Sequence, residues 1–205
     1  MIRSIVFASN NKGKVKETKA VLQSESVKVL TLSDLGLVLV PDETGTTFEE
    51  NATIKATEVA ALLKENGHSD FMVIADDSGI EIDAMGKKPG VDSANFLGTE
   101  TPFVIRNAKI LEMLEHTEER TARFVSVIAC ALPCGETILT RATIEGVISH
   151  EQKGENGFGY DPIFFLPELG KMMAELSDNE KNKISHRGKS LEKMVEALRK
   201  KGLLS

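Results

Sequence analysis

The stretch VIADDSGIEIDA, residues 73–84, places two adjacent aspartates directly after an apolar run. Residues 73–75 have the composition of the end of a buried strand, and Asp76 and Asp77 follow at once. Two carboxylates at an apolar edge are costly to desolvate unless a cation or a row of hydrogen-bond donors compensates them. Successive side chains of an extended chain point to opposite faces, so we expect the two aspartates to have different partners.

The aspartate pair predicts a divalent-cation site. In nucleotide sites Mg²⁺ is usually held by one or two carboxylates, completed by water and phosphate oxygens. Ser78 and Gly79 come next, and a glycine lets the backbone approach a ligand closely. Glu43, just before the helix expected at residues 46–67, is a candidate for the second carboxylate that binds the cation. A turn or a hub of salt bridges is the alternative explanation for the pair.

Length and composition favour one folding unit, with room for two lobes. The chain has 205 residues, of which 41% are hydrophobic, and this is enough for one well-filled core. Its 31 acidic residues exceed its 25 basic ones, so the surface as a whole should repel nucleic acid and anionic membranes. No run approaches the roughly 18 apolar residues that a membrane span needs. The opening residues also lack the apolar region of a signal peptide, so we expect a cytoplasmic protein.

The order of helical and strand-like patterns predicts a mixed α/β sheet covered by helices. Thr47 and Glu50 fit a capping box at the start of a helix. Strands are expected at residues 4–9, 71–75, 80–85, 122–132 and 137–148, the last two joined by a hairpin turn at 133–136. Helices are expected at 15–25, 46–67 and 101–116, and around Leu191, Met194, Val195 and Leu198. Glycine-rich loops are expected at 86–98 and 151–167.

The two cysteines, Cys130 and Cys134, fall where a strand runs into a turn. A disulfide or a metal pair is one interpretation, but no other cysteine lies nearby and a cytoplasmic compartment is reducing. We therefore expect both to be small, mostly buried apolar residues.

Three lysines crowd a predicted helix start in SNNKGKVKE, residues 9–17. Lys12, Lys14 and Lys16 lie where the helix dipole is already positive, and each cation there should cost roughly 0.3–1 kcal/mol. An anion bound at that end would reverse the sign, because backbone N–H groups and lysines would converge on it. The segment lacks the pattern of a P-loop. A solvated basic face is the alternative.

Two later segments have the composition of a base-binding site. GENGFGYDP, residues 154–162, alternates glycine with Phe158 and Tyr160, and such a ring can stack on a nucleobase for about 1–3 kcal/mol. EKNKISHRGK, residues 180–189, gathers basic side chains before the last helix, and arginine can read a base edge or a phosphate with its planar fork. A glycine-rich hairpin with core aromatics, and a surface histidine, are the alternatives. Together these features predict a site for a base, a triphosphate and a metal.

Six segments taken in order carry a resemblance to a known family: SNNKGKVKE, ETGTTFEENATIKA, ADDSG, PGVDSANF, GFGYDPIF and EKNKISHRGK. They closely resemble the inosine triphosphate pyrophosphatase family, over nearly the whole chain. The resemblance implies a long mixed β-sheet flanked by helices, with two lobes and an active-site cleft between them. It further implies a single catalytic domain over residues 1–205 and a homodimer. The family often has an aromatic and a basic residue where this chain has Asp92 and Asn95.

The implied activity is Mg²⁺-dependent hydrolysis of ITP, dITP and XTP to the monophosphate and pyrophosphate, which keeps deaminated purines out of DNA and RNA. Two other functions stay open. A non-catalytic nucleotide sensor would keep the basic and glycine-rich loops without needing both Glu43 and Asp77. A phosphatase with an aspartyl-phosphate intermediate would release orthophosphate, but we find no D-x-D pair placed for it at a strand end.

The resemblance also implies roles for individual residues. Asp77 would be the catalytic residue that accepts a proton from the attacking water, although an ordinary aspartate, with a pKa of about 3.9, is a weak base. Asp77 and Glu43 would bind the metal. The phosphates would be held by Ser9, Asn10, Asn11, Lys12, Gly13, Lys14, Lys55 and Ser78. The base would be framed by Phe158, Gly159, Tyr160, Asp161, Lys181, His186 and Arg187, whose donors would favour a 6-keto purine over adenine.

Overall fold

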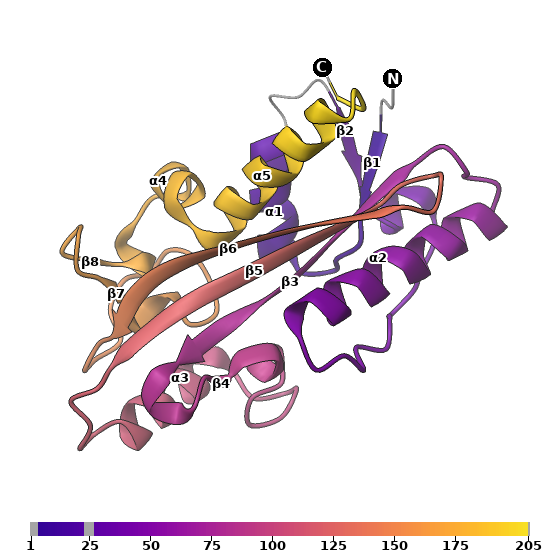
Figure 1. Ribbon diagram of the computed structural model, residues 1–205. Coiled ribbons are helices and arrows are strands. Elements are labelled where there is room, and N and C mark those ends of the chain that lie inside the picture. Colours follow the sequence, from indigo (N-terminus) through magenta and orange to yellow (C-terminus); the bar gives the residue numbers. More distant parts are fainter. Residues whose placement is uncertain (1–3, 23–26, 205) are drawn as a thin grey trace. The chain divides into compact units, whose positions relative to one another are not determined.

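The computed structural model describes residues 4–22 and 27–204, which form an eight-stranded open sheet flanked by helices (Figure 1). The strands are β1 (Ser4–Phe7), β2 (Lys28–Leu30), β3 (Met72–Ile82), β4 (Lys88–Pro89), β5 (Thr121–Ala131), β6 (Thr137–Ile148), β7 (Phe164–Leu166) and β8 (Lys171–Met172). The helices are α1 (Lys12–Leu22), α2 (Phe48–Glu65), α3 (Phe103–Met113), α4 (Asp178–Ile184) and α5 (His186–Lys200). None of these helices is both long and apolar enough to cross a membrane.

The sheet is mixed, as the sequence predicts. Its strand order is β2-β1-β3-β5-β6-β7-β8, with β4 paired to β3. The pairs β1–β2 and β1–β3 are parallel, whereas β3–β4, β6–β7 and β7–β8 are antiparallel. The parallel pairs follow from the helices that connect their strands, since a parallel neighbour needs a long crossover.

The chain divides into two compact units. Unit 1 comprises Met1–Asp77, Ser126–Ala142 and Arg187–Ser205, and unit 2 comprises Ser78–Val125 and Thr143–His186. Each unit has an apolar core of its own. A single catalytic domain over residues 1–205 stays a prediction.

In unit 1, alternate residues of β3 face different helices. Met72 and Ile74 belong to a core cluster that also contains apolar residues of α1 and α5. Val73 and Ala75 are buried as well, and the alternation of a strand points them to the opposite face, where α2 lies (Figure 1). The face that each later β3 residue occupies follows from the same alternation.

Strand β3 does not end at the aspartates. It continues through Asp76 and Asp77 to Ile82, so the prediction of two separate strands, with the pair at a strand end, was wrong. The chain stays extended because both carboxylates have cationic partners, and Ile80 and Ile82 enter the apolar core of unit 2. Consequently Asp76 falls on the face of α1 and α5, and Asp77 on the face of α2.

Helix α2 begins with the predicted capping box. The Thr47 hydroxyl accepts a hydrogen bond from the Glu50 backbone N–H at 3.2 Å, and the Glu50 carboxylate accepts one from the Thr47 N–H at the same distance. The helix ends near Asn66, as predicted, and its apolar stripe of Ala52, Ala56, Val59 and Leu63 is buried.

We predict that Thr47→Ala lowers the free energy of unfolding by about 1 kcal/mol, the usual value of a lost N-cap. Thr47→Ser should retain most of the stability, because serine keeps the accepting hydroxyl. Chemical denaturation of both variants measures the difference. Equal stabilities of the alanine and serine variants would show that the cap contributes nothing.

In unit 2, the predicted loop at 86–98 is largely ordered. It contains β4 and a 3-10 helix, Gly90–Ala94, and it lies against β3. Gly79 is required there, since a Cβ at this position would lie 2.2 Å from the Gly90 carbonyl oxygen. The close approach that we expected Gly79 to make to a ligand is therefore made to the protein's own backbone.

Arg106 of α3 holds the same segment from the other end. Its guanidinium is buried and donates to the carbonyl oxygens of Ser93 and Ala94 and, through the second terminal nitrogen, to those of Gly98 and Thr99. One side chain thus anchors three backbone positions of the loop and the residue that follows it.

The cysteine prediction holds for one residue only. Cys130 is buried in the core of unit 1, whereas Cys134 is exposed. Cys134 lies in the turn between β5 and β6, where no element of the described chain covers its side chain.

Candidate functional site

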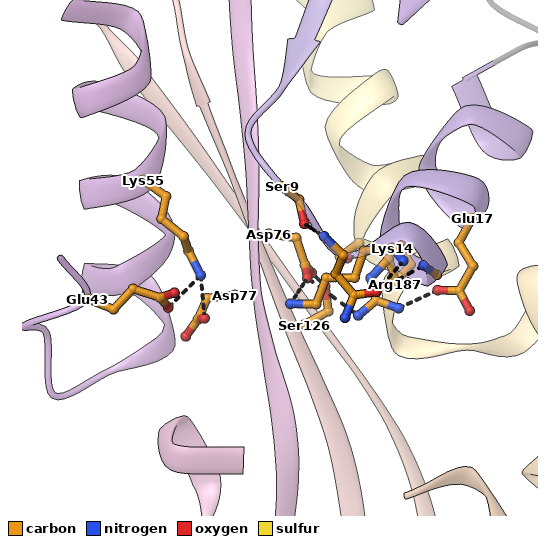
Figure 2. A network of polar contacts seen from close by, with 12 residues as sticks. Ser9, Lys14, Glu17, Glu43, Lys55, Asp76, Asp77, Ser126 and Arg187 are labelled. Carbon is orange, nitrogen blue, oxygen red and sulfur yellow. Dashed lines mark hydrogen bonds and ion pairs between the residues drawn. The ribbon is translucent and has the colours of Figure 1, made fainter. Parts of the chain in front are cut away.

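Three charged side chains meet on the α2 face of β3. The Lys55 ammonium donates to Oδ1 of Asp77 and to Oε2 of Glu43, each at 2.7 Å (Figure 2). Lys55 and Asp77 are buried, whereas the Glu43 side chain is 47% exposed. Two carboxylates from distant parts of the chain therefore converge on one cation.

Asn51 of α2 positions Glu43 relative to Lys55. The Asn51 side-chain oxygen accepts a hydrogen bond from the Gly45 backbone N–H at 2.8 Å, which ties the segment that carries Glu43 to the helix. Asn51 and Lys55 are both buried and lie one turn apart. A Cβ on Gly45 would lie 2.6 Å from the same Asn51 oxygen, so glycine permits this close contact.

Asp77 is not fully satisfied by Lys55. Its second oxygen, Oδ2, is buried and makes no hydrogen bond with any described residue. Burial raises the pKa of Asp77 to about 6, against the opposing effect of the Lys55 ammonium. Burial would lower the pKa of Lys55, but Asp77 and Glu43 outweigh it and raise that pKa. Asp77 is accordingly a stronger base than an ordinary aspartate.

Asp76 lies on the opposite face of the strand and forms the centre of a second network (Figure 2). Its Oδ2 pairs with the Lys14 ammonium at 2.6 Å and with Arg187 at 3.4 Å. Its Oδ1 accepts from the Ser126 hydroxyl at 2.8 Å, and Ser126 in turn lies 2.8 Å from Ser190. Full burial would raise the pKa of Asp76, but Arg187 and Lys14 hold it well below the usual range.

The predicted phosphate segment forms the start of α1. Asn11 caps this helix, since its side-chain oxygen accepts from the backbone N–H groups of Gly13 at 2.9 Å and Lys14 at 3.2 Å. Ser9 accepts from the Asn11 N–H at 3.2 Å. Asn10 and Lys12 are exposed, whereas Lys14 is half-buried against Asp76. The first turn of α1 contains no acidic residue, so the charges of Lys12 and Lys14 add to the positive end of the helix dipole.

Arg187 is held more tightly than the sequence suggests. It is buried at the start of α5 and pairs with Glu17 of α1 as well as with Asp76. These contacts anchor α1 and α5 to β3. The assignment of Arg187 to the base stays a prediction, and in this structure its guanidinium is engaged by two carboxylates.

In unit 2, Phe158 belongs to a compact charged cluster. Asp161 and Lys181 form a buried ion pair at 2.6 Å, and Asp161 also accepts from the Phe158 backbone N–H at 2.8 Å. The Lys181 ammonium lies 4.5 Å from the centre of the Phe158 ring. Gly157 permits the turn, because it has a φ of 75° and a Cβ there would lie 2.2 Å from an Asp161 oxygen. The structure thus brings together three of the predicted base-binding residues.

The remaining predicted residues of unit 2 lie in different surroundings. Tyr160 is buried in the core and its hydroxyl donates to the Ser93 carbonyl oxygen at 2.7 Å. The Gly159 carbonyl accepts from the Asn107 side chain at 3.1 Å. His186 stacks on Phe124 with 4.8 Å between ring centres. Ser78 is half-buried in β3. Of the two aromatic residues, Phe158 is the one that keeps partial exposure.

Sequence reasoning missed several residues that organise the site. Glu17 was visible as an acid within a basic helix start, but its partner Arg187 is 170 positions away. The sequence places Asn51 one turn before Lys55 on the same helix, but its hydrogen bond to the Gly45 N–H is visible only in the structure. Nothing in the local sequence marked the others, which are Arg106, Asn107, Ser126 and Ser190.

The fold and these side chains define a class: a mixed α/β protein with buried carboxylate–lysine clusters on both faces of a central strand and a lysine-bearing helix start beside one of them. The chain belongs to the Ham1 family, whose model matches residues 5–197.

Three known proteins illustrate the similarity. A dITP/XTP pyrophosphatase from an Exiguobacterium species is 49% identical over 190 residues, which cover 93% of this chain and 94% of that protein. A dITP/XTP pyrophosphatase from Clostridium perfringens is 42% identical over 205 residues, covering 99% and 100%. The solved Staphylococcus aureus Ham1 protein has a TM-score of 0.83 at 39% identity, covering 97% of this chain and 99% of that one.

Proposed function

We propose that this chain is a nucleoside-triphosphate pyrophosphatase. It hydrolyses non-standard purine nucleotides (ITP, dITP and XTP) to the monophosphate and pyrophosphate, which prevents incorporation of deaminated purines into nucleic acid. The observation that carries the proposal is the convergence of Glu43 and Asp77 on one cation, with a buried Asp77 oxygen left over. Membership of the Ham1 family, and relatives named dITP/XTP pyrophosphatase, support the substrate class.

Glu43 and Asp77 fit a Mg²⁺ ion. Mg²⁺ prefers carboxylate oxygens and keeps several waters, so two carboxylates are a sufficient protein contribution. The unpartnered Oδ2 of Asp77 is an available ligand atom, and the exposed Glu43 leaves room for water. When bound, Mg²⁺ would neutralise charge on the phosphate oxygens and polarise a water molecule.

In the proposed reaction, a water oxygen bonds to the α-phosphorus as the bond from that phosphorus to the bridging oxygen of the β-phosphate breaks. Pyrophosphate leaves, and the proton lost by the water passes to Asp77. Lys14 and Lys55 stabilise the negative charge that develops on the phosphates, which is the main work of a protein in phosphoryl chemistry. The positive start of α1 attracts the phosphates, which Ser9, Asn10, Asn11, Lys12 and Gly13 hold, and Ser78 completes the set.

For the base, we propose that Phe158 supplies the stacking surface and that Lys181, Asp161 and His186 shape the polar recognition. Donors aimed at a 6-keto group would be left unpaired by adenine, which costs about 1–3 kcal/mol per buried group. Gly159 and Tyr160 would fix the backbone of this segment, and Arg187 would assist from α5. We also propose that the enzyme acts in the cytoplasm as a homodimer.

One assay separates this function from its alternatives. Incubation with ITP and Mg²⁺ should release pyrophosphate. Release of orthophosphate would identify a phosphatase, and tight binding without any product would identify a sensor. The same assay with XTP, GTP, ATP and dTTP should give the highest kcat/KM for ITP and XTP. Equal rates on ATP would contradict the substrate class.

We predict that Phe158→Leu raises KM for ITP by about tenfold and leaves kcat nearly unchanged, because loss of base stacking costs about 1–3 kcal/mol of binding. Phe71→Leu is a suitable control in unit 1, since Phe71 precedes β3 and pairs with the ring of His68 rather than with any candidate residue. Steady-state kinetics on ITP measures both. An unchanged KM would remove Phe158 from the base site.

A further inference from the structure

Lys55 holds a positive charge against both of the carboxylates, Glu43 and Asp77, that are proposed to bind a divalent ion. Its ammonium lies 2.7 Å from an oxygen of each carboxylate, and no other cation is paired with either of them among the described residues. A bound metal would share these carboxylates with a fixed positive charge a few ångströms away. The free protein therefore holds a monovalent cation next to the place where the reaction needs a divalent one.

The arrangement is built into the fold. Lys55 projects from the middle of α2, a helix of 18 residues with a complete capping box. The same helix holds the Glu43 segment through Asn51 and Gly45. Asp77 is fixed by the pairing of β3 within the sheet. Because three separate constraints bring these groups together, the contact between Lys55 and the two carboxylates is specified by the structure.

We propose that Lys55 makes metal binding depend on the nucleotide. In the free protein its ammonium neutralises part of the Glu43 and Asp77 charge and repels a divalent ion. A triphosphate offers the ammonium new anionic partners, so Lys55 turns from the carboxylates to phosphate oxygens and the carboxylates become available to the metal. Metal and nucleotide then bind with positive coupling, which is reciprocal by thermodynamic necessity. This inference rests on the proposed role of Glu43 and Asp77 as metal ligands.

The coupling predicts an unusual effect of removing the positive charge of Lys55 from the site. Taking away a lysine that merely binds phosphate would leave the affinity for a free metal ion unchanged. Taking away one that competes with the metal should strengthen metal binding in the absence of nucleotide, by about tenfold or more given the size of charge repulsion at contact distances. The two roles thus differ in a measurement that needs no catalysis.

The experiment titrates Mn²⁺ into protein without nucleotide and follows free Mn²⁺ by electron paramagnetic resonance. We expect Lys55→Met and Lys55→Gln to lower the Mn²⁺ dissociation constant by about tenfold relative to the wild type. Lys64→Met, in the exposed last turn of the same helix, should leave it unchanged. Circular dichroism tests whether each variant is folded. Because two Lys55 variants are measured, the experiment can still be interpreted if one of them misfolds. Unchanged or weaker Mn²⁺ binding in both folded Lys55 variants would overturn the inference.

A second titration separates this inference from the proposed metal site. It repeats the measurement with a non-hydrolysable α,β-imido analogue of ITP, which should increase wild-type Mn²⁺ affinity more than that of Lys55→Met. Glu43→Gln and Asp77→Asn should weaken Mn²⁺ binding in this ternary complex. If they do not, the metal site itself is wrong. If they do, but Lys55→Met shows no gain without nucleotide, only the role of Lys55 fails.

Discussion

Asp77→Asn is expected to lower kcat for ITP hydrolysis by roughly 10²–10⁴-fold, the usual range for a lost general base, with nucleotide affinity close to that of the wild type. Asparagine has the same shape and keeps one oxygen that can accept from Lys55, so the local packing should survive. It cannot take a proton from water, and it is a poorer metal ligand than a carboxylate. The loss should therefore fall on turnover.

Two measurements test this expectation. Pyrophosphate release from ITP and Mg²⁺ gives kcat, and equilibrium binding of the α,β-imido analogue without divalent metal gives the nucleotide affinity. Asp70→Asn, an exposed position in the loop before β3, is the matched control and should keep normal turnover. A turnover within a few-fold of the wild type in Asp77→Asn would exclude Asp77 as the base and as a necessary metal ligand.

Asp76→Asn should have the largest effect on stability, lowering the free energy of unfolding by about 3–5 kcal/mol, as is typical when one partner of a buried ion pair is removed. Asp76 is fully buried and compensates Lys14 and Arg187. Arg187 would keep Glu17, but Lys14, which is half-buried, would lose its ion pair with Asp76. Ser126→Ala, which removes one neutral hydrogen bond to the same carboxylate, should cost only about 1 kcal/mol.

The pH dependence of stability provides an independent check on Asp76. Its pKa is lowered in the folded state, so its contribution is fully present above the unfolded value of about 3.9 and is lost as the pH falls below it. The difference in unfolding free energy between the wild type and Asp76→Asn should thus shrink as the pH is lowered from 6 towards 3, by denaturant titration. A difference that is constant over this range would mean that the charge of Asp76 does not stabilise the fold.

The network around Asp76 also links stability to the proposed phosphate site. Lys14 is both a partner of this buried carboxylate and a candidate phosphate ligand, and Asn11 caps the helix from which it projects. Loss of Asp76 should therefore weaken nucleotide binding in addition to lowering stability, because Lys14 would no longer be held at the helix start. Asp77→Asn would then lower turnover and leave nucleotide affinity nearly unchanged, whereas Asp76→Asn would lower both stability and nucleotide affinity. The two residues are nevertheless neighbours in the chain.

Features of the fold and the site that depend on residues close together in the sequence could be predicted. The capping box of Thr47 and Glu50 and the buried stripe of α2 were readable because they depend on residues within a few turns of each other. The opposite faces of Asp76 and Asp77 were readable because side chains alternate along any extended chain. The strand boundary at this pair was misjudged, since two acidic residues look like a strand end until their cationic partners are known.

By itself the sequence determined the types of element, the apolar stripes and the placing of adjacent aspartates on opposite sides of one strand, because each is set by interactions between residues close along the chain. Only the tertiary structure decided which cation each carboxylate meets. Lys55 is 22 positions from Asp77, and Arg187 is 111 from Asp76. Such pairs form where packing of helices on the sheet brings distant charges together and excludes the water that would otherwise solvate them.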